Sequence, residues 1–451
     1  MKSKVIVFII LMLFALPVIK AFSQNRNVVW VHGFCGDATS LQHYATIFTN
    51  ERKINSTRQS YNTTSGLPFA ASQVRTSIPP TVPGGTSYAS TNMGIGHSMG
   101  GVMIREVDRM PIAGNISAPK KLGGFITIAS PNYGAPISAN ILDGTATSTI
   151  ATASTKLTAG PIADPVFQPV WILAAGITVY MIIDNLNAIK GYFSQQTNND
   201  LKEGSQAMNN INDYNSYSPV PHKISIIAEE NSNVLWRLVG SMNNGAGSSG
   251  NPGDQKMVSD MNDVRNFYDF MYDGHRWGLL GIPPLFSLPI ANKWKQGRDW
   301  LDNSETIWCS LIKSSRVESY QVPTGYWKEV PCGPFPPPRG DKPPDYPYDP
   351  DNPFIPGKCY EWVNTGYTTQ YTTVTYKNDG LLPTYCQELK GVDSNSGNRY
   401  VIDHANHMEL KNMTYSKKPN GQVNDGTKNT LNAIFDRPQN TSWWHTPRKT
   451  P

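Results

Sequence analysis

The sequence predicts an α/β fold in which helices cover both faces of a mainly parallel sheet. Apolar runs of strand length occur at 27–32, 123–129 and 223–228, and residues typical of turns follow or bound them. Between the first two runs, apolar residues recur at helical spacing in 41–48 and 101–109. Continuous apolar strands that alternate with helices are typical of a sheet buried on both faces.

The first 23 residues have the pattern of a cleaved secretion signal. Lys2 and Lys4 give a positive start, and the apolar run at 5–17 is too short to span a bilayer. Small residues follow this run, as a signal peptidase requires. We therefore expect a mature chain that begins at Gln24 and a protein that is secreted or periplasmic.

The charge of the chain argues against a nucleic-acid partner. Removal of the signal segment takes away three lysines and no acid, so the formal charge falls from +5 to +2. Nucleic-acid binding needs a concentrated basic face, and the sequence has no run of lysine and arginine to supply one. No feature of the sequence specifies an oligomeric state.

The cysteines permit a disulfide framework in an exported protein. Two disulfides could form in any of three pairings among the four later cysteines, which are Cys309, Cys332, Cys359 and Cys386. Cys35 lies far from them and is the odd one. No cysteine or histidine spacing resembles a zinc site, which needs close pairs of ligands.

A serine motif follows in the segment GHSMGG, where Ser98 stands between Gly96 and Gly100. A nucleophilic serine on a sharp strand-to-helix turn needs neighbours without Cβ atoms, since the backbone there is strained. Its hydroxyl would lie at the N-terminus of the next helix, where the helix dipole favours developing negative charge. The motif predicts that Ser98 is a catalytic nucleophile.

A second motif, HGFCG at 32–36, directly follows the first buried strand. Acyl transfer passes through an oxyanion, which two preorganised backbone N–H groups can stabilise. The candidate donors are the N–H groups of Phe34 and Met99. The motif therefore predicts an oxyanion hole opposite Ser98.

Four segments give the chain a resemblance to secreted lipases and esterases of the α/β-hydrolase family. They are VHGFCG at 31–36, GHSMGG at 96–101, ASPNYGAP at 129–136, and the pair NDGLLP at 378–383 with ANHMEL at 405–410. The resemblance covers the two ends of the chain. It implies an α/β-hydrolase fold with an apolar lid insertion and a second large insertion.

The resemblance divides the chain after the signal into five parts. They are a core part at 24–137, a lid-like insertion at 138–200, a core strand at 201–230, an inserted subdomain at 231–376 and a C-terminal core part at 377–451. The apolar stretch at 171–183 is either a buried core helix or a lid over the active site. In similar lipases a Ser-Pro-x-x-Gly segment leads into a lid, and Ser130 to Gly134 match it. The lid is therefore favoured.

In the α/β-hydrolase fold the catalytic residues occur in the chain order serine, acid, histidine, so we look for the acid and then the histidine after Ser98. We predict His407, since Asn406-His407-Met408-Glu409 matches the family's histidine loop, with His404 as the alternative. We predict Asp379 as the acid, because Gly380 supports a tight turn there. The alternative acids are Glu229 or Glu230, which end an apolar strand, and Asp403.

The resemblance implies no organic cofactor, and we assign no metal. Some similar bacterial lipases bind a calcium ion that braces the histidine loop, through an acid two residues beyond the histidine and an acid upstream of the catalytic acid. Glu409 occupies the first position, but no aspartate lies between Asp351 and Asp379. A structural calcium is therefore left open.

Together these features predict an exported serine hydrolase that cleaves carboxylic esters. The expected substrate is a lipid ester, so we expect the enzyme to contact a lipid interface transiently. Polyesters, phospholipids, thioesters and peptides remain as alternatives that the same residues could cleave. The rival from another class is a binding or adhesion protein on a hydrolase scaffold that has lost catalysis.

Overall fold

The computed structural model describes most of the chain. The described residues are 26–79, 91–110, 121–164, 196–217, 222–230, 234–243, 253–277, 284–331, 359–392, 397–412, 425–439 and 441–449. The apolar stretch at 171–183 lies outside these residues, as does the signal segment.

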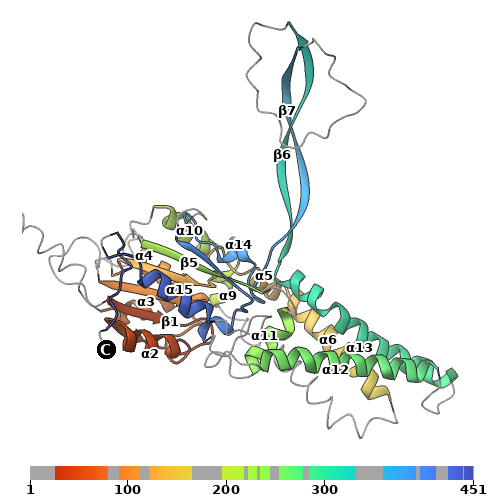
Figure 1. The fold of residues 1–451 in the computed structure, drawn as a ribbon. Coiled ribbons are helices and arrows are strands. Elements are labelled where there is room, and N and C mark those ends of the chain that lie inside the picture. The colour runs from red at the N-terminus through yellow and green to blue at the C-terminus, as the bar shows by residue number, and fades with distance from the viewer. Residues whose placement is uncertain are drawn as a thin grey trace, which may run out of the picture. The chain divides into compact units, whose positions relative to one another are not determined.

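Six parallel strands form one sheet (Figure 1). Their order in the sheet is β2-β1-β3-β4-β5-β8. Their bounds are Ile54–Arg58 (β2), Arg26–Val31 (β1), Asn92–His97 (β3), Gly124–Ile128 (β4), His222–Glu229 (β5) and Arg399–Asp403 (β8). Four of these strands are buried along most of their length, which explains the apolar runs in β1, β4 and β5. The predicted α/β class with a parallel sheet is confirmed.

One face of the sheet packs against α2 (Gln42–Glu51) and α15 (Gly426–Phe435). Trp30 of β1 stacks on Phe48 of α2 with ring centroids 6.2 Å apart, and Phe48 meets Phe435 of α15 edge-on at 5.2 Å. These contacts hold the first and last helices of the described residues on the same layer.

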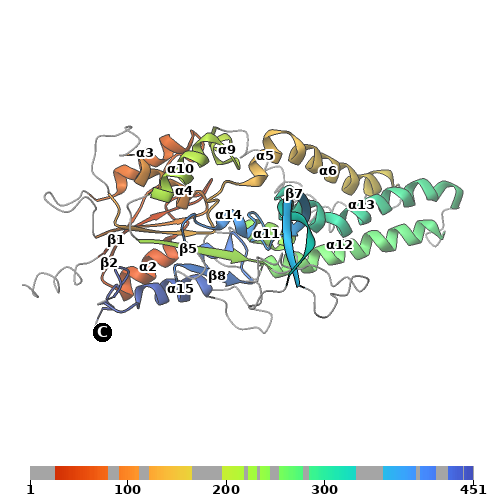
Figure 2. The same ribbon diagram turned by 90° about the horizontal axis from the view of Figure 1, so that it is seen from above.

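The opposite face packs against α3 (Leu67–Ser77), α4 (Met99–Arg109) and α10 (Gln206–Tyr217). Val29 and Val31 of β1 point to this face, because alternate residues of a strand face opposite sides. Figure 2 shows these three helices across the sheet from α2 and α15. The short helix α9 (Gln196–Leu201) adds Leu201 to the same cluster.

A second group of helices forms its own apolar cluster. It consists of α5 (Pro136–Leu142), α6 (Thr145–Ala163), α11 (Val234–Asn243), α12 (Gly253–Arg276) and α13 (Pro284–Leu311), of which α6 and α12 pack along α13. Trp294 of α13 meets Tyr268 of α12 edge-on, with ring centroids 4.9 Å apart. Among the described helices, none combines the length and the hydropathy needed to cross a membrane.

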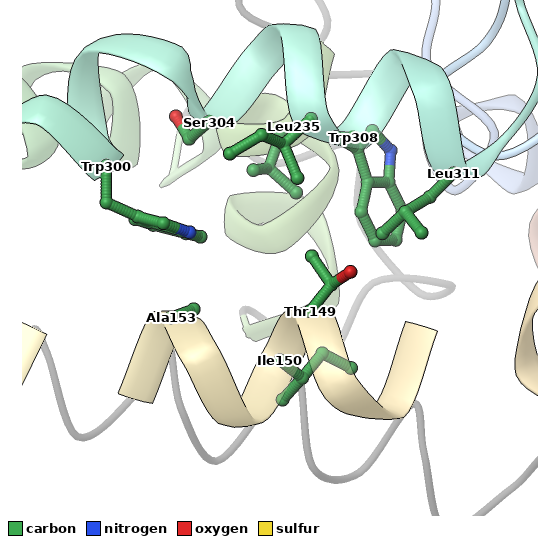
Figure 3. A pocket seen from close by; sticks show the side chains of 9 residues that line it. Thr149, Ile150, Ala153, Leu235, Trp300, Ser304, Trp308 and Leu311 are labelled. Carbon is green, nitrogen blue, oxygen red and sulfur yellow. The ribbon is translucent and has the colours of Figure 1, made fainter. Parts of the chain in front are cut away.

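A small apolar hollow, partly open to solvent, lies between α6, α11 and α13 (Figure 3). Its walls include Ile150, Ala153, Leu235, Trp300 and Trp308. The two hydroxyl groups in the lining donate to their own helices, Thr149 to the carbonyl of Thr145 and Ser304 to that of Leu301. The hollow therefore presents mainly apolar surface.

Residues 315–375 form a separate compact unit. Its strands β6 (Ser315–Val330) and β7 (Cys359–Thr375) pair antiparallel along their whole length, with a bulge between Thr324 and Gly325. The inserted subdomain predicted at 231–376 thus contains two different parts. Helices α11, α12 and α13 belong to the larger unit with the sheet, and only the hairpin is a unit of its own.

The cysteines depart from the expected framework. Cys35, Cys309 and Cys386 carry thiols and form no disulfide. Each of the three pairings that would give two disulfides needs both Cys309 and Cys386, so none of them forms. The other two cysteine side chains lie outside the described part of the structure.

Candidate active site

Ser98 is the single residue between the end of β3 and the start of α4. Its backbone has φ 56° and ψ −130°, and the residue is 9% exposed. A residue with a Cβ atom rarely adopts such a positive φ, so the surrounding structure must hold it. This conformation is the strained strand-to-helix turn that the GHSMGG motif predicts.

Two glycines allow this turn to pack closely. A Cβ atom on Gly100 would lie 2.2 Å from the carbonyl oxygen of Val31 in β1. A Cβ atom on Gly96 would lie 2.4 Å from the backbone of Gly100. The first turn of α4 can approach β1 and β3 only because both positions lack side chains.

His407 lies between Ser98 and Asp379. Its Nε2 is 2.8 Å from Ser98 Oγ, and its Nδ1 is 2.7 Å from Asp379 Oδ2. All three side chains are buried. Because a carboxylate accepts at Nδ1, the neutral ring carries its proton there, and the Nε2 lone pair faces the serine hydroxyl.

Asp379 is oriented by its own turn. Its Oδ1 accepts hydrogen bonds from the N–H groups of Leu381 at 2.9 Å and Leu382 at 2.7 Å. This leaves Oδ2 for His407. The turn requires Gly380, whose φ is +92°, and Trp308 of α13 donates its indole N–H to the Gly380 carbonyl at 2.6 Å.

The backbone of His407 is held on two sides. Its N–H donates to the carbonyl of Asp379 at 2.7 Å, and its carbonyl oxygen is 2.8 Å from His97 Nε2. Burial, with the nearby His407, lowers the pKa of His97 well below its usual value. A neutral His97 can therefore donate from Nε2 to this carbonyl.

Met99 directly follows Ser98, and the loop that holds Phe34 passes close to it. Met99 is the first residue of α4, where N–H groups have no partner within the helix. Phe34 follows Gly33, on which a Cβ atom would lie only 2.8 Å from Ser98 Cβ. The loop before it is fixed by Tyr61, whose hydroxyl donates to the His32 carbonyl at 2.6 Å and whose ring stacks on His32.

The alternative acids have other partners. Glu229 accepts from Lys377 at 2.6 Å, and Glu230 pairs with Arg237 of α11. Asp403 is exposed at the end of β8. Since His407 contacts Asp379, the structure joins Ser98 to the histidine and acid that the motifs favour, and not to these alternatives.

Glu409 does not fit a calcium ligand. Its Oε1 accepts from Arg237 Nη2 at 2.8 Å, and its Oε2 accepts from the N–H of Asn406 at 3.0 Å. A cation is therefore already present at this carboxylate, in the form of a guanidinium group. Within the described residues, no group of three or more histidine, cysteine, aspartate or glutamate side chains could hold a metal ion.

Three residues beside the site were not assigned a role from the sequence: His97, Arg237 and Trp308. His97 lies inside the serine motif, but its partner is a backbone carbonyl 310 residues away. Arg237 had a visible signal, because it is a single charge in the apolar run VLWRLV, and a charge there needs a buried partner.

The chain has no match among models of known protein families, and no curated protein matches it in sequence. Among solved structures it is similar to a mature lipase from Bacillus licheniformis, with 11% identity and a TM-score of 0.30 over 51% of this chain and 76% of that one. It is also similar to a phospholipase from Legionella pneumophila, with 17% identity and a TM-score of 0.28 over 51% of this chain and 44% of that one.

A third similar structure is a carboxyl esterase from Bacillus coagulans, with 14% identity and a TM-score of 0.25 over 46% of this chain and 72% of that one. Likeness of this degree does not identify the chain. The fold assignment rests instead on the parallel sheet, the helices on both faces and the serine turn between β3 and α4. These features make it an α/β-hydrolase fold.

Proposed function

We propose that the chain is an exported serine hydrolase that cleaves carboxylic esters. The observation that carries the proposal is the unbroken hydrogen-bonded series Ser98–His407–Asp379, with its two distances of 2.8 and 2.7 Å. A hydroxyl, an imidazole and a carboxylate in this order are the parts that nucleophilic acyl transfer requires.

In the proposed reaction, His407 Nε2 takes the proton of Ser98 as Oγ attacks the ester carbonyl. The N–H groups of Phe34 and Met99 stabilise the oxyanion, and the imidazolium returns its proton to the leaving alkoxide. Asp379 stabilises the imidazolium throughout. Water, activated by His407 in the same way, then releases the acid from the acyl-enzyme.

We propose a lipid ester as the substrate class. The support comes from the sequence, in which a segment with the pattern of a secretion signal precedes the core and a strongly apolar stretch at 171–183 follows the nucleophile helix. A lid of this composition, as the resemblance implies for 171–183, would favour an acyl chain over a polar peptide, since contact with it removes apolar surface from water.

The test begins with a fluorophosphonate probe on the purified mature protein. We expect the probe to label the wild type and the control Ser72→Ala in α3, and to leave Ser98→Ala unlabelled. Loss of the nucleophile should lower kcat on a nitrophenyl ester by a factor on the order of a million. Absence of labelling in a folded wild type would favour a binding protein on a hydrolase scaffold.

An acyl-length series then tests the substrate class. We expect kcat/KM to rise towards long acyl chains and the rate to increase at a lipid interface. A maximum at short chains with no interfacial effect would support a simple esterase. Faster cleavage of a peptide amide than of any ester would contradict ester hydrolysis.

A further inference from the structure

Three charged side chains are buried beside the acid turn and the histidine loop. The side chains of Glu230 and Glu409 are each 1% exposed, and that of Arg237 is 6% exposed. Arg237 donates from Nη1 to Glu230 Oε2 and from Nη2 to Glu409 Oε1. We refer to these three residues as the Arg237 clamp.

Glu230 connects the clamp to the acid turn. It follows the last residue of β5, and its N–H donates to the carbonyl of Asn378 at 2.7 Å. Asn378 directly precedes Asp379, and its side-chain oxygen accepts from the N–H of Gly380 at 2.9 Å. The end of β5 and the turn that presents the acid are thus held together.

Glu409 connects the clamp to the histidine loop. Its Oε2 accepts from the N–H of Asn406, the residue before His407, at 3.0 Å. The Asn406 side chain accepts from the N–H groups of Met408 and Glu409 and donates to Ser241 of α11 at 2.8 Å. Asn406 and Glu409, which lie on either side of His407 in the sequence, are therefore both bonded to α11, through Ser241 and Arg237.

The chemistry of arginine suits this position. Its planar guanidinium presents donors in a fixed fork, so one side chain can bind two carboxylates in set directions, which a lysine ammonium does less well. Without a cation, two buried carboxylates would face each other in a dry region. Loss of one partner of a buried ion pair is strongly unfavourable.

We propose that Arg237 is a positioning residue that aligns His407 with Asp379, and that its guanidinium supplies the positive charge that the buried carboxylates of Glu230 and Glu409 require. Arg237 acts through Glu230 on the acid turn and through Glu409 on the histidine loop, without touching the reacting atoms. This role rests on the proposed hydrolase function.

The first experiment compares Arg237→Ala with Arg265→Ala. Arg265 is a matched control, since it lies on α12 and makes a partly exposed ion pair with Asp302. For Arg237→Ala on a soluble ester we expect kcat to fall by roughly tenfold to a hundredfold with little change in KM, because small misplacement of catalytic groups is costly. Guanidinium chloride, below denaturing concentrations, should restore part of kcat in this variant alone.

A second variant separates alignment from folding. Glu230→Gln/Arg237→Leu/Glu409→Gln removes all three charges, and neutral replacement of a buried ion network is often compatible with a stable fold. We expect its melting temperature to stay near that of the wild type while kcat remains low. A triple variant with wild-type kcat would overturn the proposal, as would an equal loss of kcat in Arg265→Ala.

Two further measurements keep the outcomes distinct. Hydrogen exchange of the segments 377–387 and 403–412 should be faster in Arg237→Ala than in Arg265→Ala, and this readout does not depend on activity. A wild type that fails to label or to cleave esters refutes the proposed function, whereas unchanged exchange in Arg237→Ala refutes the clamp. A chelator should leave wild-type kcat unchanged; loss of activity that added calcium restores would contradict the cation role of Arg237.

Discussion

The conformation of Ser98 depends on residues that contribute no side chain. With φ at 56°, the serine is held in a backbone region that is unfavourable for it, and the close approach of Gly96 and Gly100 to their neighbours supports that region. A methyl group at Gly100 would overlap the carbonyl of Val31, which is backbone of the central sheet and has little room to move.

We therefore expect Gly100→Ala to displace the serine turn. The variant should lose fluorophosphonate labelling and at least about a hundredfold in kcat, because the hydroxyl and the Met99 N–H move together. The control is Gly204→Asn, where φ is +73° and no atom lies within 4 Å of an added Cβ. Asparagine tolerates that conformation. Normal labelling of Gly100→Ala would show that the turn adapts.

The sequence predicted some residues of the site but gave no role to others. Ser98 could be predicted because all residues of its motif are adjacent in sequence. Asp379 could be predicted because Asn378 and Gly380 are typical turn residues. His97 and Arg237 could not be interpreted in the same way. Their partners lie far away in sequence, and in the case of His97 the partner is a backbone carbonyl, which no residue type reveals.

Helix α13 connects the helical group to the acid turn. Trp308, which also lines the apolar hollow, donates to the carbonyl of Gly380 next to Asp379. Leu382, which follows the same turn, belongs to the apolar cluster of these helices. The geometry of the acid therefore depends on an element that contributes no residue to the triad.

Trp308→Phe tests this connection. The change keeps most of the apolar contact but leaves a buried carbonyl oxygen without its donor, which should cost about 1–3 kcal/mol of unfolding free energy. We also expect a lower kcat on an ester substrate. Urea unfolding measures the free energy, and steady-state kinetics measures kcat. Trp300→Phe, in the same helix and the same hollow, is the control and should keep kcat. Equal losses of kcat in both variants would argue against a specific effect on the turn.

The elements that the sequence predicted are those with simple patterns. β1, β4 and β5 are buried apolar runs, and α2 and α4 show one apolar face. No helix is predicted within the insertion at 231–376, although in the long helix α12 Met257, Met261, Val264, Tyr268 and Met271 recur at helical spacing. Strand β8 was missed because it is short and half-exposed at the sheet edge, so it lacks an apolar run.

The titration of Lys411 makes the stability of the whole molecule depend on pH. Burial lowers the pKa of the Lys411 ammonium from 10.5 to about 8, with a small opposing effect of Asp37. Below pH 8 the side chain is charged in both the folded and the unfolded state. Between about pH 8 and 10.5 the unfolded chain binds more protons, so the contribution of Lys411 to stability rises with pH.

Comparison with Lys411→Met isolates this effect. Subtracting the unfolding free energy of the variant from that of the wild type cancels the other titrating groups. We expect the difference to rise by roughly 3 kcal/mol between pH 8 and 10.5, from the conversion of pKa shifts to free energy. Denaturant unfolding at several pH values measures it. Parallel stability curves for the two proteins would show that Lys411 titrates normally.

The hairpin has ends that lie next to each other. Ser315 is paired with Thr375, and the residues just outside them are bonded directly, since the N–H of Tyr376 donates to the carbonyl of Ser314 at 2.6 Å. If residues 315–375 were deleted or replaced, the chain ends to be joined, Ser314 and Tyr376, would already be neighbours. The length and sequence of this hairpin can therefore change without altering how the strands and helices of the larger unit are connected.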